Sequence, residues 1–139
     1  MIKKFVALGL FLFLMASPAF GEILMWDPIQ DDSVTEVRVF ESTTQGQYNY
    51  ASPTYTAPKN QNYVVLTRGN DDTRYYWVAR ATDGTNDSVD STEVSWVYYS
   101  SGGGGQGPAA PGGIGIIDCN TVQSGQRGYE ECSTAKQLP

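Results

Sequence analysis

The composition of this 139-residue chain excludes several classes of function. It contains no histidine, which rules out Ser-His-Asp and Cys-His catalysis as well as metal binding through imidazole. Its formal net charge of −6 opposes binding to the phosphates of nucleic acids and to anionic membranes. The length is that of a single domain, and the charge is most simply that of a well-solvated acidic surface.

Residues 1–21 have the pattern of a secretory signal peptide. Lys3 and Lys4 precede an apolar run at 5–15, and small residues stand three and one positions before a cut at Glu22. The run is shorter than the roughly 20 residues of a spanning helix, although an uncleaved anchor is the alternative. Without Lys3 and Lys4, 7 basic residues face 15 acidic ones, a net charge of −8. We therefore expect a protein that is secreted, periplasmic or held at the cell surface, without membrane contact after cleavage.

Residues 22–100 have the pattern of an all-β domain built from short strands. Val, Tyr, Thr and Trp are frequent, turn residues separate the apolar segments, and no stretch keeps a helical period. A stretch at 42–58, which contains three tyrosines, is predicted to be mostly loop with one short edge strand. The other strands are predicted, in chain order, at residues 23–27, 36–41, 63–66, 73–82 and 94–99.

Alternation along these strands separates a core face from an outer face. Tyr76 and Arg80 point away from the core on the long strand at 73–82, and Phe40 is expected to join them. Aromatic residues on an exposed sheet face stack on sugars or contact proteins, although ordinary strand propensity also explains them. The residues predicted for the core are Leu24, Trp26, Val37, Val39, Leu66, Tyr75, Trp77, Ala79 and Val94.

The order of these core residues resembles that of a fibronectin type III domain of the secreted bacterial kind. The resemblance covers about residues 22–100 and implies an immunoglobulin-like β-sandwich with Trp26 buried on the family's second strand. It also implies that the hydroxyl of Tyr75 caps nearby backbone at the corner after Leu66. The interval from Leu66 to Tyr75 is longer than usual, so this turn should bulge. The family's first strand is missing or fused with the second, which leaves a sheet edge open to strand addition.

Six aspartates in two loops form a candidate calcium site. In the resembled fold, the loops after the first predicted strand and before the last one lie at the same pole. Carboxylate oxygens are ligands that Ca²⁺ prefers, but the spacing matches no calcium-loop signature. The sequence favours the other interpretation, a solvated acidic pole in a protein without a cofactor. The aspartates are Asp27, Asp31, Asp32, Asp83, Asp87 and Asp90.

A linker rich in Gly and Pro, at 101–113, separates the domain from a tail at 114–139. It spans roughly 20 Å as a random coil and about 45 Å when extended, so the tail can return to the domain. Cys119 and Cys132 predict a disulfide within the tail. We expect the bond to stabilise only the tail, because the linker uncouples it from the sandwich. The competing expectation is that residues 114–117 pair with a sheet edge of the same chain or a neighbour.

The sequence favours a function without catalysis. The resemblance implies a binding or structural module that mediates adhesion or protein contact at the cell surface or outside the cell. One alternative is a self-assembling subunit whose tail adds a strand to a neighbour, and another is a carbohydrate-binding accessory module. The expected partner is therefore a protein, an extracellular glycan or a second copy of the chain, and not a nucleic acid.

Overall fold

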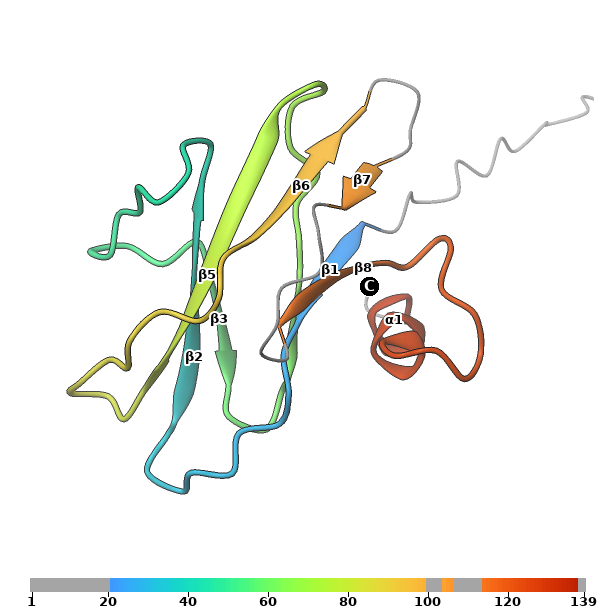
Figure 1. The fold of residues 1–139 in the computed structure, drawn as a ribbon. Helices are drawn as coiled ribbons and strands as arrows, with labels where there is room; N and C mark the ends of the chain where they lie inside the picture. The colour runs from blue at the N-terminus through green and yellow to red at the C-terminus, as the bar shows by residue number, and fades with distance from the viewer. Residues whose placement is uncertain (1–20, 100–103, 107–113, 138–139) are drawn as a thin grey trace, which may run out of the picture.

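The computed structural model describes residues 21–99, 104–106 and 114–137, and it confirms an all-β sandwich. The predicted signal peptide, up to residue 20, and most of the predicted linker lie outside the described residues. Among the described residues, no helix is long and apolar enough to span a membrane. The β1 sheet has the strand order β4 (Tyr63–Val65), β1 (Glu22–Met25) and β8 (Gly115–Asp118). The β5 sheet, facing it in Figure 1, has the order β3 (Tyr55–Pro58), β2 (Glu36–Ser42), β5 (Arg74–Thr82), β6 (Val94–Tyr98) and β7 (Gly104–Gln106).

The main hydrophobic core lies between the two sheets and contains every residue that the sequence predicts for it. Alternate residues enter the core because successive side chains of a strand point to opposite faces. On β5, for example, Trp77 is fully buried, and Tyr75 stacks on it with a distance of 6.0 Å between ring centroids. The structure adds further members of the same cluster, namely Ala57, Val64, Trp96, Tyr98, Ile114 and Ile116.

The turn before β5 is held by the hydroxyl of Tyr75. This oxygen accepts a hydrogen bond from the backbone N–H of Asn70 at 2.9 Å, which is the cap that the resemblance implies. The aromatic ring packs directly on Gly69, where an added Cβ would lie 2.2 Å from the ring carbon Cε2. A side chain at position 69 would therefore displace the ring, so the long turn depends on this glycine.

The tail is docked on the sandwich and is not uncoupled from it. β8 pairs antiparallel with the edge of β1, with Leu24 opposite Ile116 and Met25 opposite Gly115. Ile114 and Ile116 enter the main core, so they point to the same side of the strand. The expected pairing of residues 114–117 with a sheet edge is thus present within the chain, on the edge of β1 that does not pair with β4.

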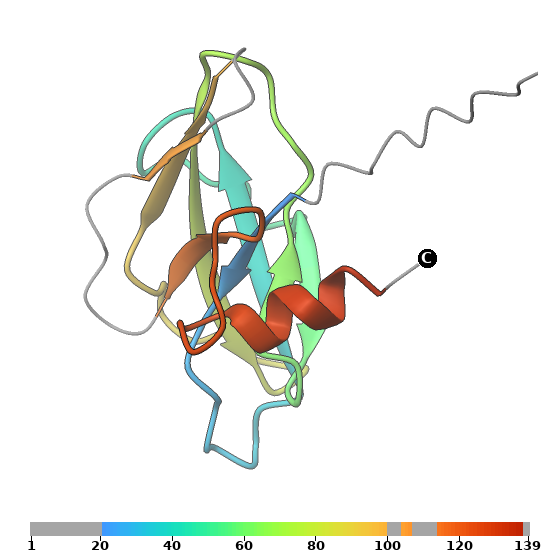
Figure 2. The ribbon, with the colours of Figure 1, turned by 90° about the vertical axis from the view of Figure 1, so that its right-hand side faces the viewer.

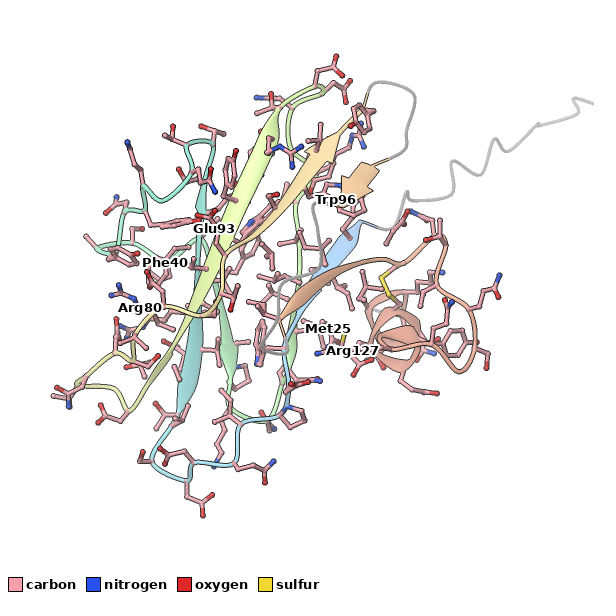
Figure 3. The ribbon with its side chains drawn as sticks, in the orientation of Figure 1. Met25, Phe40, Arg80, Glu93, Trp96 and Arg127 are labelled. Carbon is pink, nitrogen blue, oxygen red and sulfur yellow. A yellow bond between two sulfur atoms is a disulfide. The ribbon has the colours of Figure 1, made fainter. Side chains whose placement is uncertain are left out.

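A second hydrophobic cluster lies on the outer face of the β1 sheet. Ile23 and Met25 point away from the main core and pack against the disulfide-bonded Cys119 and Cys132. The helix α1 (Tyr129–Ala135), which the sequence analysis did not predict, covers this face in Figures 1 and 2. Met25 lies between β1 and the tail in Figure 3. The disulfide is therefore part of a buried interface with the domain.

We predict that Ile23→Ala lowers the free energy of unfolding by about 2–5 kcal/mol, as expected for a buried aliphatic side chain. Val65→Ala is the matched control, because Val65 pairs with Ile23 across the sheet but remains 42% exposed beyond the tail. This control should change stability by no more than about 0.5 kcal/mol. Urea unfolding of both variants measures the difference, and equal effects would show that the tail does not cover β1 in solution.

We also predict that reducing the Cys119–Cys132 bond lowers the melting temperature of the whole sandwich. The bond closes a short loop, which is worth on the order of 3 kcal/mol in the chain-entropy model. Because Cys119 and Cys132 pack on Ile23 and Met25, that loss reaches the domain. Calorimetry with and without reductant tests this, with the Cys119→Ala/Cys132→Ala variant as the control that should not respond to reductant. An unchanged melting temperature would restore the interpretation of an uncoupled tail.

Candidate functional site

The predicted aromatic face on the β5 sheet is partly covered by a loop. Phe40 is only 1% exposed, so its prediction as an exposed binding residue is corrected. Residues 43–54, here called the 43–54 loop, fold back over the outer face and bring Tyr50 against Phe40, with ring centroids 5.1 Å apart. Val78, on the same face, is also buried. The 43–54 loop therefore covers the apolar part of the outer face of the β5 sheet.

Arg80 holds the 43–54 loop in place. Its guanidinium carbon lies 3.6 Å from the centroid of the Tyr50 ring, and its Nε donates to Asp90 Oδ1 at 2.6 Å. The Tyr50 hydroxyl donates to the other carboxylate oxygen of Asp90 at 2.5 Å. Burial opposes ionisation of Asp90, but the hydrogen bonds from Arg80 and Tyr50 outweigh it and hold its pKa below the ordinary value. The hydrogen bond to Asp90 also raises the pKa of Tyr50. Arg80 is thus engaged within the protein.

Glu93 anchors the start of the same loop. Its Oε2 accepts hydrogen bonds from the Tyr48 hydroxyl at 2.6 Å and from the backbone N–H of Gly46 at 3.0 Å. Burial and the hydrogen bond to Glu93 raise the pKa of Tyr48 well above its ordinary value, so Tyr48 stays neutral. Gly46 adopts a positive φ of 71°, a backbone conformation that favours glycine.

The part of the β5 sheet face that remains open is a polar depression of about 330 Å³ around Tyr76. Tyr76 is half-buried and pairs across the sheet with Ser95. Arg74, one β-repeat earlier on the same face, donates from Nη1 to Ser95 Oγ at 3.0 Å. The residues that line the depression are Gln45, Arg74, Tyr76, Glu93, Val94 and Ser95. We call this set the Tyr76 depression.

The Tyr76 depression combines groups that the sequence analysis identified only in part. Arg74 takes part in none of the ion pairs found among the described residues, so guanidinium donors remain available beside the Tyr76 ring. Glu93 supplies a carboxylate acceptor, and the Gln45 amide supplies both kinds of group. Strand alternation would have placed Arg74 on the same face as Tyr76, whereas Gln45 reaches it only through the path of the 43–54 loop.

The six aspartates of the candidate calcium site are used within the protein. Asp27, Asp32 and Asp87 form ion pairs, as does Asp90 with Arg80. Their respective partners are Arg127 at 2.9 Å, Lys59 at 2.8 Å and Arg38 at 3.1 Å. Among residues 21–99, 104–106 and 114–137, no three acidic or cysteine side chains gather in a way that could hold a metal ion.

Asp31 and Asp83 each close a turn of their own loop. The Oδ1 atom of Asp31 accepts from the hydroxyl and backbone N–H of Ser33, and these bonds lower the pKa of Asp31. The Oδ1 atom of Asp83 accepts from the backbone N–H groups of Asn86 and Thr85, both at 2.7 Å, which lower its pKa. These contacts are the local turns that aspartate commonly forms.

A buried carboxyl group lies at the start of β1. Glu22 is 7% exposed and pairs across the sheet with Asp118 of the tail. Burial raises the pKa of Glu22, and the neighbouring Asp118 carboxylate adds to the effect. The fully buried Tyr98 also has a raised pKa because of burial and the charge of Glu22. No sequence pattern pointed to this buried carboxyl group.

Comparison of the chain with protein-family models, with curated proteins and with solved structures finds no match.

We predict that Asp90→Asn loosens the 43–54 loop and lowers the melting temperature at neutral pH. The folded-state pKa of Asp90 is depressed, so its stabilising contribution is present above the unfolded value and is lost as the pH falls through the folded value. The difference from the wild-type chain should therefore be constant from about pH 7 to 5 and shrink below about pH 3.9. Tyr50→Phe, which keeps the ring on Arg80, should have a smaller effect. A pH-independent difference would show that the Asp90 charge is not what holds the loop.

Proposed function

We propose that this protein is a secreted, non-enzymatic binding module of fibronectin type III type that contacts a partner at the cell surface or outside the cell. The signal-peptide pattern of residues 1–21 supports the location. The absence of histidine from the sequence and the use of the pole aspartates in turns and ion pairs support a function without catalysis.

The strand arrangement supports the resemblance to fibronectin type III domains. The long β5 lies between β2 and β6, and Leu24 of β1 and the adjacent Trp26 share the main core with its residues. The cap on Asn70 by the Tyr75 hydroxyl agrees with the corner that the family implies. β8 lies beside β1, where the family's missing first strand would be expected.

The Tyr76 depression is the observation that carries the proposal of a binding module. It lies on the open face of the β5 sheet, where it offers an aromatic ring, guanidinium donors and a carboxylate acceptor. Arg74 and Tyr76 lie on β5, Glu93 directly precedes β6, and hydrogen bonds to Glu93 fix the 43–54 loop beside them. Rigid positioning lowers the entropic cost of holding a ligand.

The second candidate function is carbohydrate binding. The aromatic, donor and acceptor groups of the Tyr76 depression favour this partner class. A sugar presents hydroxyl groups that both donate and accept, together with a weakly polar face that stacks on aromatic rings. Arg74 and Gln45 can donate, Glu93 and Gln45 can accept, and Tyr76 provides the ring. A protein partner would instead be expected to bury Tyr76 and Arg74 as interface anchors, since Tyr and Arg are enriched there.

We predict that Tyr76→Ala and Arg74→Ala each weaken binding of the fluorescently labelled mature protein to the cells that produce it by at least tenfold. Tyr99→Ala is the matched control, because Tyr99 is an exposed tyrosine (44%) that does not line the depression. Equal binding by all of these variants would exclude the Tyr76 depression as the contact surface.

Treating the cells before binding separates the two partner classes. Periodate, which cleaves vicinal diols, should abolish binding to a glycan, whereas protease should abolish binding to a protein. Affinity electrophoresis in gels containing polysaccharides then identifies the glycan class. Retardation that persists in Tyr76→Ala would contradict the carbohydrate candidate.

A further inference from the structure

We propose that the tail, residues 114–137, is exchangeable between two copies of this chain, so that β8 and α1 of one copy complete the β1 sheet of the other. The partner inferred here is a second copy of the chain. The proposal does not depend on the Tyr76 depression, which lies on the opposite sheet.

The contacts that hold the tail are directed to β1 and its neighbours. β8 pairs with all of β1, from Glu22 opposite Asp118 to Met25 opposite Gly115. Ile114 and Ile116 fill the main core beside Leu24 and Trp26. A tail supplied by a second copy would make the same backbone and core contacts, because none of them requires the two strands to belong to one chain.

Polar contacts fix the orientation of the tail on the domain. Arg127 Nη2 donates to Asp27 Oδ1 at 2.9 Å, and Asn62 Nδ2 donates to Glu131 Oε1 at 3.3 Å. Gly128 packs so closely that an added Cβ would lie 2.8 Å from Ile117 and 3.2 Å from the sulfur of Met25. The tail therefore binds the domain in one specific orientation. The tail of a second copy carries the same contact residues, whereas an unrelated strand does not.

The tail forms one covalently linked unit, and it packs incompletely against the β6 side of the sandwich. The Cys119–Cys132 bond joins the end of β8 to α1, so strand and helix would move together. On the side of β6, an open groove of about 590 Å³ is lined by Trp96 and by tail residues that include Ile116, Val122 and Arg127. The indole N–H of Trp96 is buried, and none of the described residues accepts a hydrogen bond from it. β1 is thus the main attachment of the tail.

The connection between β7 and the tail determines whether the closed monomer or the tail-exchanged dimer is populated. The predicted linker is interrupted by β7, which pairs with β6, so the connection from β7 to the tail is residues 107–113. This segment includes three glycines and two prolines, a composition typical of a linker. A short linker of this composition is expected to present its own tail at an effective concentration in the millimolar range. The closed monomer is then favoured in dilute solution, and exchange becomes favoured at high concentration or when the linker cannot reach.

The test is a full-length mature chain that lacks residues 107–112. One residue then remains between Gln106 and Ile114, which is about 7 Å of extended chain. β7 and β8 belong to opposite sheets, and packed sheets lie about 10 Å apart, so β8 cannot reach its own β1. We expect twice the monomer mass by light scattering at micromolar concentrations where the wild-type chain is monomeric, with Ile116 still protected from amide exchange. Replacing residues 107–112 with six Gly and Ser residues is the control and should leave the chain monomeric.

An equimolar mixture of ¹⁵N-labelled and ¹³C-labelled chains distinguishes exchange from ordinary surface association. Interchain contacts between Leu24 and Ile116 are expected in the shortened dimer, because these residues face each other across β1 and β8. A shortened chain that stays monomeric with rapidly exchanging β8 amides would overturn the proposal, as would a dimer without these contacts. If the shortened chain does not fold, the same labelled mixture of wild-type chain, incubated at millimolar concentration, decides between interchain contact and none.

Discussion

The structure depends on the complete enclosure of β1. This short strand is paired on one edge by β4 and on the other by β8, and its residues are buried on both faces. Leu24 and Trp26 support the main core, while Ile23 and Met25 support the cluster under the tail. Such enclosure is typical of strands inside layered folds and unusual for an antiparallel sheet, which commonly leaves one face to solvent. The tail supplies the missing layer, so strand, helix and disulfide share the task of shielding one four-residue segment.

The sandwich was predictable because its signals are local. Period-two alternation in residues 73–82 assigns Trp77 to the core, and the same pattern locates the strands that flank it. The tail was only half predictable, since its cysteines and Ile114–Ile117 segment indicate a strand but not its destination. One signal was available and unused: residues 23–26 are apolar on both faces, which indicates a strand that is covered on both sides.

The candidate site was less predictable because it depends on the path of a loop. Nothing local to Phe40 distinguishes an exposed aromatic residue from one covered by Tyr50, which is ten positions away in the sequence. The aspartates were ambiguous for a different reason, since a carboxylate suits a metal, a turn or an arginine equally well. The short Asp31-Asp32-Ser33 and Asp83-Gly84-Thr85 segments favour the turn, because aspartate readily accepts from backbone two residues on. Sequence spacing thus identified the face and the pole, while the three-dimensional contacts decided their use.

The enclosure of β1 also has a consequence for how the chain reaches its fold. β1 stands near the beginning of the described chain and β8 near its end, so the contact between Leu24 and Ile116 closes most of the described chain into one loop. Contacts of such long sequence separation raise contact order and slow folding, because the entropy of loop closure is lost before the contact forms. During synthesis, the apolar segment at 23–26 is made long before β8, the strand that covers its edge.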